Sequence, residues 1–129
     1  MRFMPFLASL TLLAAAPASA QEWRPAPEYD VLLTPYDIAP AEIRLPADRP
    51  VRLRFVNTSN QGLTFSAGRF FRASKNRTRD GEWVQGGRVS VPALSTRTVV
   101  VVPKAGRYKV KGGTMFHKLL GMKGRIVVE

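Results

Sequence analysis

Residues 112 to 129 read GGTMFHKLLGMKGRIVVE, and this stretch carries both the clearest fold signal and the clearest chemical signal of the chain. It contains His117, the only histidine among the 129 residues, and two of the four methionines, Met115 and Met122. Its last residues, RIVVE, are rich in β-branched side chains and predict a terminal strand. The stretch therefore predicts a loop with soft side chains that leads into a strand.

Strand signals recur at short intervals upstream of this stretch. VRLRFVN (51–57) alternates apolar residues with Arg52 and Arg54, as a strand with one buried face does. The prolines of PYDIAPAEIRLPADRP (35–50) exclude a helix and suit an edge strand with turns. Short strands with Gly and Pro between them predict an all-β sandwich or barrel. The other strand candidates are YDVLLT (29–34), LTFSA (63–67), TRTVVVVP (96–103) and YKV (108–110).

One charged insertion, AGRFFRASKNRTRDGEWVQGG (67–87), interrupts the strand pattern. We expect a short helix around Phe70 to Lys75, held to the core by Phe70 and Phe71, and then a loop as far as Gly86-Gly87. Its cations form a candidate partner surface, although a charged loop can also be only solvated. That candidate surface consists of Arg69, Arg72, Lys75, Arg77, Arg79 and, from the later loop, Lys118.

The N-terminal residues predict an exported protein. Arg2, the apolar run FLASLTLLAAA and Ala18-Ser19-Ala20 together match a signal peptide over residues 1–20. Residues 21–28 then form a proline-containing lead-in, and 29–129 form one domain, which we expect to be monomeric. The apolar run is too short to span a bilayer, so an uncleaved anchor is the weaker alternative, and no transmembrane segment is expected in the mature chain. We expect a periplasmic or secreted protein.

Composition restricts the chemistry further. The chain has no cysteine, which excludes thiol catalysis, thiolate zinc sites, iron–sulfur clusters and thiolate-ligated copper. Lysines and arginines number 20 against 9 acidic residues, a formal net charge of +11. Export makes nucleic acid an unexpected partner, so an acidic protein or an anionic lipid surface fits this charge better. The alternative is that the charge serves only solubility.

The remaining chemical signal is a set of soft metal ligands, namely imidazole and thioether side chains. No nucleophile with an adjacent base, no carboxylate pair and no P-loop is present, so we expect no enzyme. Imidazole and thioether together suit copper, above all Cu(I). Met115 and His117 would face one side of an extended backbone, and Met122 could return to that side across the turn at Gly121. Alternatively, the methionines fill gaps in a core and His117 lies on the surface.

The order of these features resembles the cupredoxins, in particular the exported plastocyanin/azurin-like branch, from about Tyr29 to Glu129. The resemblance rests on Pro40-Ala-Glu-Ile-Arg-Leu-Pro-Ala47, RLRFVN, TFSAGRFF, GRYKVK and, most specifically, H-x-x-x-G-M-x-G-x-I-V-V from His117 to Val128. It implies a Greek-key β-sandwich with one irregular, partly helical charged insertion.

The resemblance also assigns copper-ligand positions, of which two are lost. The first histidine of such proteins corresponds to Leu63 and the cysteine to Gly112, whereas His117 and Met122 match the second histidine and the axial methionine. A blue, electron-transferring site is therefore not expected. Two interpretations remain. In the first, His117, Met122 and Met115 form a Cu(I) site for copper carriage or delivery, and its affinity for copper falls below about pH 6 as the histidine protonates. In the second, the domain is a metal-free docking module whose basic surface binds an acidic protein or anionic membrane.

Overall fold

A computed structural model describes residues 26–113 and 122–129. The predicted signal peptide, most of the predicted lead-in, and Met115, His117 and Lys118 lie outside these residues. The first strand begins at Glu28, the last residue of the predicted lead-in. In the described ranges, no helix has the length and apolar character needed to cross a bilayer.

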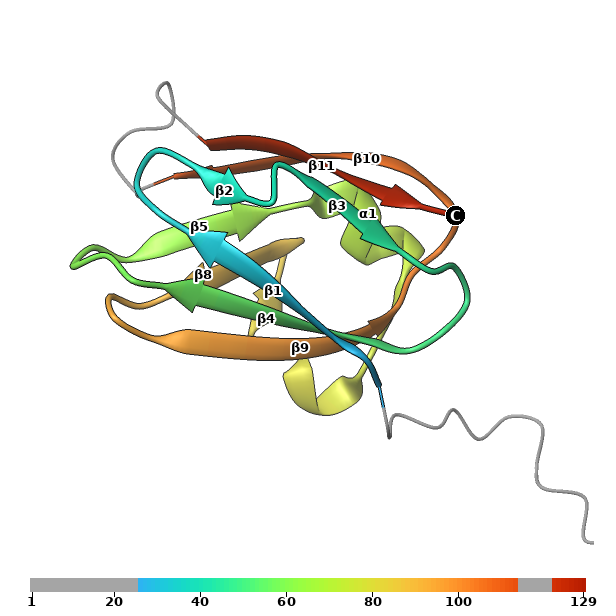
Figure 1. Cartoon of the computed structure of the whole chain (residues 1–129). Helices are drawn as coiled ribbons and strands as arrows, with labels where there is room; N and C mark the ends of the chain where they lie inside the picture. Colours follow the sequence, from blue (N-terminus) through green and yellow to red (C-terminus); the bar gives the residue numbers. More distant parts are fainter. Residues whose placement is uncertain (1–25, 114–121) are drawn as a thin grey trace, which may run out of the picture.

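Two β-sheets pack face to face and form a sandwich (Figure 1), which confirms the predicted all-β class. The five-stranded sheet has the order β2-β1-β4-β9-β6 and the six-stranded sheet the order β3-β11-β10-β5-β8-β7. The strands of the first sheet are β1 (Glu28–Leu33), β2 (Ile38–Ala39), β4 (Val51–Asn57), β6 (Lys75–Asn76) and β9 (Thr96–Val102). The strands of the second are β3 (Glu42–Leu45), β5 (Leu63–Ser66), β7 (Val84–Gln85), β8 (Arg88–Val91), β10 (Gly106–Gly113) and β11 (Met122–Val128).

The core lies between the inner faces of the two sheets. In β4, Val51, Leu53 and Phe55 are buried while the arginines between them are half-buried, as the alternation predicts. Phe55 meets Phe65 of the opposite sheet with 4.6 Å between ring centroids. Fully burying one such ring stabilises the fold by roughly 1.5–3 kcal/mol, so this pair holds the two sheets together at the centre.

The proline-containing segment 35–50 crosses from one sheet to the other. It contributes β2 to the edge of the five-stranded sheet and β3 to the edge of the six-stranded sheet, with a cis peptide bond at Ala39–Pro40 between them. The predicted edge position is confirmed for both strands. β3 runs parallel to β11 and β1 runs parallel to β4, so each sheet contains one parallel pair in an otherwise antiparallel arrangement.

The charged insertion forms a short helix that packs on the six-stranded sheet. The helix, α1 (Gly68–Ala73), begins and ends two residues before the predicted range. Phe70 and Phe71 are buried as predicted, and the Phe70 ring meets Tyr108 of β10 edge-on at 5.5 Å. Lys75 was predicted to lie at the end of the helix, but it belongs to β6 and pairs with Val102 of β9. A 3₁₀ turn, η1 (Thr78–Asp80), follows.

Candidate functional site

The structure brings three of the four predicted copper-ligand positions to one end of the six-stranded sheet. Gly112 of β10 pairs with Phe65 of β5 on one side and with Met122 of β11 on the other. Leu63 lies two residues before Phe65 in β5. The fourth position, His117, and the additional candidate Met115 lie outside the described residues. Three adjacent strands, β5, β10 and β11, therefore carry the matching positions.

The residues at the two lost positions do not fit a thiolate copper site. Leu63 is buried with 1% of its surface exposed and supplies no donor atom. Gly112 lies on the same face of β10 as the buried side chains of Tyr108 and Val110, is half-buried, and has no side chain. The described residues also contain no group of three or more His, Cys, Asp or Glu side chains that could hold a metal ion. A blue copper centre, which needs two imidazoles and a thiolate, is therefore excluded by the donor set itself.

Asn57 fixes the turn that leads into Leu63. Its buried side-chain amide donates to the carbonyl oxygens of Gln61, Val91 and Pro92 at 2.8, 3.0 and 3.1 Å. Its side-chain oxygen accepts from the Ser59 amide and hydroxyl at 2.9 and 2.7 Å. The residue thus joins the β4–β5 turn to the end of β8, beside the strand that carries the first lost position.

The outer face of the six-stranded sheet carries like charges opposite one another. Lys109 of β10 pairs with Arg125 of β11, and Lys111 pairs with Lys123. All four residues are exposed. Like charges directly opposite each other destabilise a sheet, so this arrangement is unfavourable for the isolated domain.

The outer face of the five-stranded sheet shows the opposite arrangement. Glu28 of β1 pairs with Arg52 of β4, and Asp30 pairs with Arg54. The carboxylate of Asp30 lies 3.4 Å from the Arg54 guanidinium. Opposite charges therefore lie opposite each other across β1 and β4 on one face of the sandwich, whereas like charges lie opposite each other across β10 and β11 on the other.

Glu42 on the edge strand β3 neutralises only one end of the six-stranded face. Its carboxylate contacts Arg44 at 3.0 Å and Arg125 at 2.8 Å. The hydrogen bond from Arg44 lowers the pKa of Glu42 below its ordinary value, and the charges of Arg44 and Arg125 lower it further. Lys109, Lys111 and Lys123 take part in none of the ion pairs found among the described residues.

Several proteins of known structure are similar to this chain in fold. Neither the protein-family models nor the curated proteins compared with the sequence give a match. Among solved structures, auracyanin B is similar with a TM-score of 0.57 and 21% identity over 81% of this chain and 90% of that protein. An auracyanin from the photosynthetic bacterium Roseiflexus castenholzii gives a TM-score of 0.56 and 15% identity over 81% of this chain and 98% of that one. The chain has a cupredoxin-like fold.

A third similar structure comes from a copper transporter. The metal-binding domain of the Cu(I)-exporting P-type ATPase CopA of Streptococcus pneumoniae, solved with Cu(I), gives a TM-score of 0.50 and 16% identity over 79% of this chain and 84% of that one. At these identities the similarity concerns the fold. The predicted cupredoxin-like β-sandwich is confirmed.

The predicted partner surface divides into separate parts in this cupredoxin-like fold. Arg69 and Arg72 lie on α1 beside β10, whereas Lys75 lies on β6 at the edge of the other sheet. Arg77 was included in the predicted surface, but its guanidinium donates to the Asp80 carboxylate, with Nε–Oδ2 at 2.9 Å and Nη2–Oδ1 at 3.0 Å. The cations of β10 and β11 were not predicted as a surface, although GRYKVK places a cation at every second position.

Arg77 therefore has a structural role that a variant can reveal. Asp80 is 4% exposed and also accepts from the Val100 amide at 2.9 Å. Arg77→Ala removes two charge-assisted hydrogen bonds from this carboxylate, and we expect it to lower the free energy of unfolding by about 2 kcal/mol. Arg79→Ala, at an exposed neighbouring arginine, should change it by less than about 0.5 kcal/mol. Urea denaturation measures both, and equal stability of the two variants would contradict a structural role for the pair.

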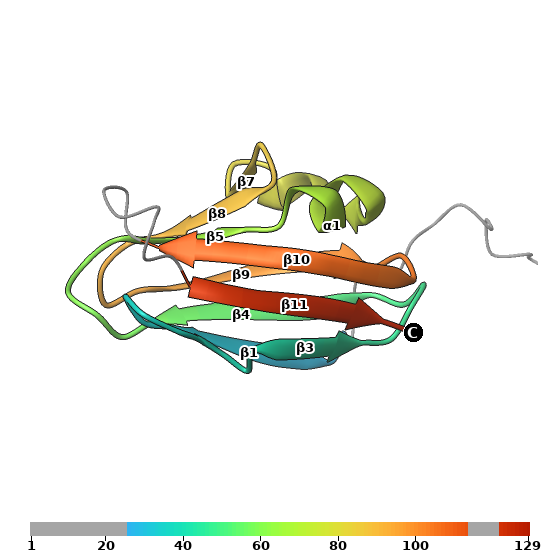
Figure 2. The same ribbon diagram turned by 90° about the horizontal axis from the view of Figure 1, so that it is seen from above.

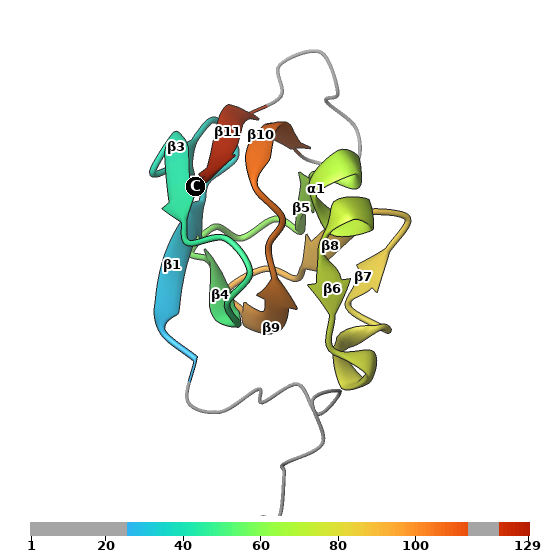
Figure 3. The ribbon, with the colours of Figure 1, turned by 90° about the vertical axis from the view of Figure 1, so that its right-hand side faces the viewer.

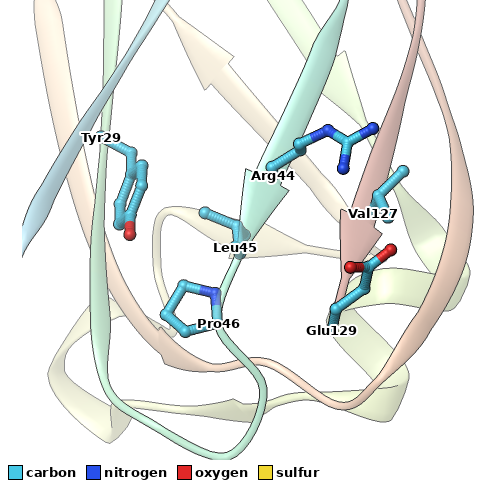
Figure 4. Close-up of a pocket in the computed structure, with 6 residues that line it drawn as sticks. All are labelled: Tyr29, Arg44, Leu45, Pro46, Val127 and Glu129. Carbon is cyan, nitrogen blue, oxygen red and sulfur yellow. The ribbon is translucent and has the colours of Figure 1, made fainter.

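A pocket near the end of β11 carries balanced charge (Figure 4). Its volume is about 320 Å³, and its lining comes from β1, β3 and the C-terminal residues. Arg44 and Glu129 are its charged residues, so it offers no net charge to attract an ion. The lining residues are Tyr29, Arg44, Leu45, Pro46, Val127 and Glu129, which include no histidine or cysteine. We assign no chemistry to it.

Proposed function

We propose that the mature protein binds one copper ion as Cu(I), in a non-blue, thiolate-free site, and carries or delivers it outside the cytoplasm. The pairing of Gly112 with Met122 is the main structural support. Neighbouring strands lie about 4.8 Å apart, so the nine residues between these two start and end close together. Met115 and His117 belong to that short connection, and Met122 follows it directly. Gly112 and Met122, which flank the other two donors in the sequence, are thus neighbours in the sheet.

The donor chemistry also supports Cu(I). One imidazole and two thioethers are soft enough for Cu(I), whereas calcium, magnesium and zinc prefer harder or thiolate ligands. The structure of CopA's metal-binding domain with Cu(I) indicates that a similar fold can accommodate this ion. Under this proposal His117 and Met122 bind the metal, Met115 replaces a lost ligand, and the protein is a carrier and not an enzyme.

Thermal unfolding with and without Cu(I) tests this proposal. A ligand that binds only the folded state at a hundredfold excess over Kd adds about 2.7 kcal/mol, so we expect the Tm to rise on the order of 10 °C. His117→Ala should abolish the rise, while Met122→Ala and Met115→Ala should reduce it. Lys123→Ala serves as a control with no donor removed. If Cu(I) leaves the Tm of the unaltered mature protein unchanged, the proposal fails.

The like-charge pairs of the six-stranded face favour a second candidate function. In this candidate the domain binds no metal and is a monomeric docking module whose basic face meets an acidic protein or an anionic membrane. Lys109 opposite Arg125 and Lys111 opposite Lys123 would be relieved by a negative surface. Such binding should weaken steeply as the salt concentration rises, because exposed charges are screened.

A further inference from the structure

We propose that the cleft between α1 and β10 is a binding site for a phosphate group. The cleft has a volume of about 340 Å³ and opens on the outer side of the six-stranded sheet. Figures 2 and 3 show α1 lying along one side of this sheet, next to β10 and β5. The residues that line the cleft are Ser66, Gly68, Arg69, Arg72, Lys109 and Lys111. The inference rests on the basic face of the docking candidate, and it holds whether or not the domain binds copper.

Four cations approach the cleft from two elements. Lys109 and Lys111 are two residues apart on β10, so both project to the outer face about 7 Å from each other. Arg69 and Arg72 are three residues apart on α1, a spacing that brings their Cβ atoms to about 5–6 Å. A pair of lysines and a pair of arginines therefore line the same cavity from its two sides.

No described carboxylate neutralises these four cations. None of them takes part in the ion pairs of the described residues, and the lining contains no Asp or Glu. On β11 the strand partner of Lys111 is Lys123, which is in no ion pair of the described residues, whereas the partner of Lys109 is Arg125, which Glu42 neutralises. Residues 114–121, TMFHKLLG, contain no acidic residue either. The potential in the cleft is therefore positive, and a bound anion would relieve the mutual repulsion.

Packing fixes the position of α1 relative to β10, the two elements that carry the four cations. Phe70 and Phe71 anchor α1 in the core. At the start of the helix the Ala67 amide donates to the Gly87 carbonyl at 2.9 Å. Gly87 approaches so closely that a Cβ on it would lie 2.5 Å from the Gly68 Cα. The helix is thus held against the β7–β8 turn, and its arginines keep their position relative to β10.

The four cations of the lining suit a phosphate group, which brings up to two negative charges and three oxygens, whereas a carboxylate brings one charge and two oxygens and a halide only one charge. A Cβ at Gly68 would lie 3.3 Å from the Arg72 Nη1, so this guanidinium folds back over the glycine at the cleft. Guanidinium forks bind phosphate oxygens in pairs, and lysines add point charges. Ser66, which pairs with Lys111, adds a hydroxyl donor to the lining. At about 340 Å³ the cleft has room for a phosphate group together with part of the molecule that carries it.

A phosphate titration followed by amide NMR tests the site. With inorganic phosphate added against chloride at equal ionic strength, we expect saturable shifts at Ser66, Gly68 and Lys111. The double variant Arg72→Glu/Lys109→Glu should weaken binding at least about tenfold, because two charge-assisted contacts are lost. Arg49→Glu/Lys104→Glu makes the same change in net charge at exposed positions outside the cleft lining and should leave binding unchanged. Equal affinity of the two double variants would overturn the proposal.

Vesicles then distinguish a lipid headgroup from a soluble phosphate ester. Phosphatidylcholine vesicles with a minority of phosphatidic acid should bind the unaltered protein and release the cleft variant if the phosphate belongs to a lipid. If inorganic phosphate binds in the cleft but these vesicles do not bind, the ligand is a soluble phosphate ester. If vesicles bind both double variants equally and phosphate causes no specific shift, the basic face docks without the cleft. That result refutes the phosphate site and leaves the docking candidate intact.

Discussion

The double variant Leu63→His/Gly112→Cys is expected to turn intensely blue when loaded with Cu(II). It restores one imidazole and one thiolate at the two lost positions, and with His117 and Met122 these complete the ligand set of a blue copper site. Gly112 is not among the described glycines with positive φ, so its backbone accepts a cysteine. It also pairs directly with Met122, which brings the thiolate position beside the axial one. Visible absorption after copper addition measures the result.

Each single variant is the control for this experiment. Leu63→His without the thiolate should stay colourless, because the intense colour of such sites depends on the copper–thiolate bond. Gly112→Cys without the second imidazole should give a weaker or unstable centre. Absence of blue colour in a folded double variant would show that Leu63 and Gly112 are not equivalent to the ligand positions, and that the resemblance in this region is limited to the fold.

Asn57→Asp is expected to lower the free energy of unfolding by about 4 kcal/mol. The amide group of Asn57 donates to three carbonyl oxygens, and a carboxylate would present oxygen to all three. Each buried acceptor that loses its donor costs about 1–3 kcal/mol, and the carboxylate is 1% exposed at this position. A domain of this size is stable by about 5–15 kcal/mol, so the loss is large. Urea denaturation measures it.

The same turn supplies a matched control for this prediction. Asn60 lies three residues away and is exposed, so Asn60→Asp introduces the same charge without removing a buried donor. We expect a change of less than about 0.5 kcal/mol. If Asn57→Asp were as stable as Asn60→Asp, the hydrogen-bond network around Asn57 would not hold the β4–β5 turn.

Local patterns were sufficient to predict much of the fold. The alternation in VRLRFVN predicted the buried face of β4, and the prolines of 35–50 predicted an edge strand where the structure has two, β2 and β3. These features depend on residues close together in sequence, where spacing determines which side chain faces the core. The short helix and the burial of Phe70 and Phe71 followed from the same local reasoning. β8 was not predicted, because a strand of four residues after Gly86-Gly87 gives a weak signal.

The charge arrangement could not be predicted because it depends on strand register. Whether Lys109 faces an acid or a base is decided by its partner Arg125 on another strand. The ion pair of Arg77 with Asp80 is local, but the Asp80 carboxylate also accepts a hydrogen bond from the Val100 amide, 20 residues further on. The scattered cations of the sequence were therefore predicted to form one basic surface. In the structure they belong to a buried ion pair, to a sheet edge neutralised by a carboxylate, and to a cleft without a neutralising carboxylate among the described residues.

One strand links the two proposed functions. On the inner side of β10, Gly112 lies at the end of the buried series that includes Tyr108 and Val110. On its outer side, Lys109 and Lys111 line the cleft beside α1. Copper carriage at the loop end and phosphate binding at the cleft would therefore use opposite sides of one element, and either can be removed by mutation without the other.

An anaerobic titration of the mature protein with Cu(I), in competition with a chromophoric chelator, tests the central claim most directly. We predict that one Cu(I) is withdrawn from the chelator per chain, that no blue colour develops, and that His117→Ala no longer competes. The claim would be contradicted if the unaltered protein withdrew no Cu(I), or if His117→Ala withdrew as much.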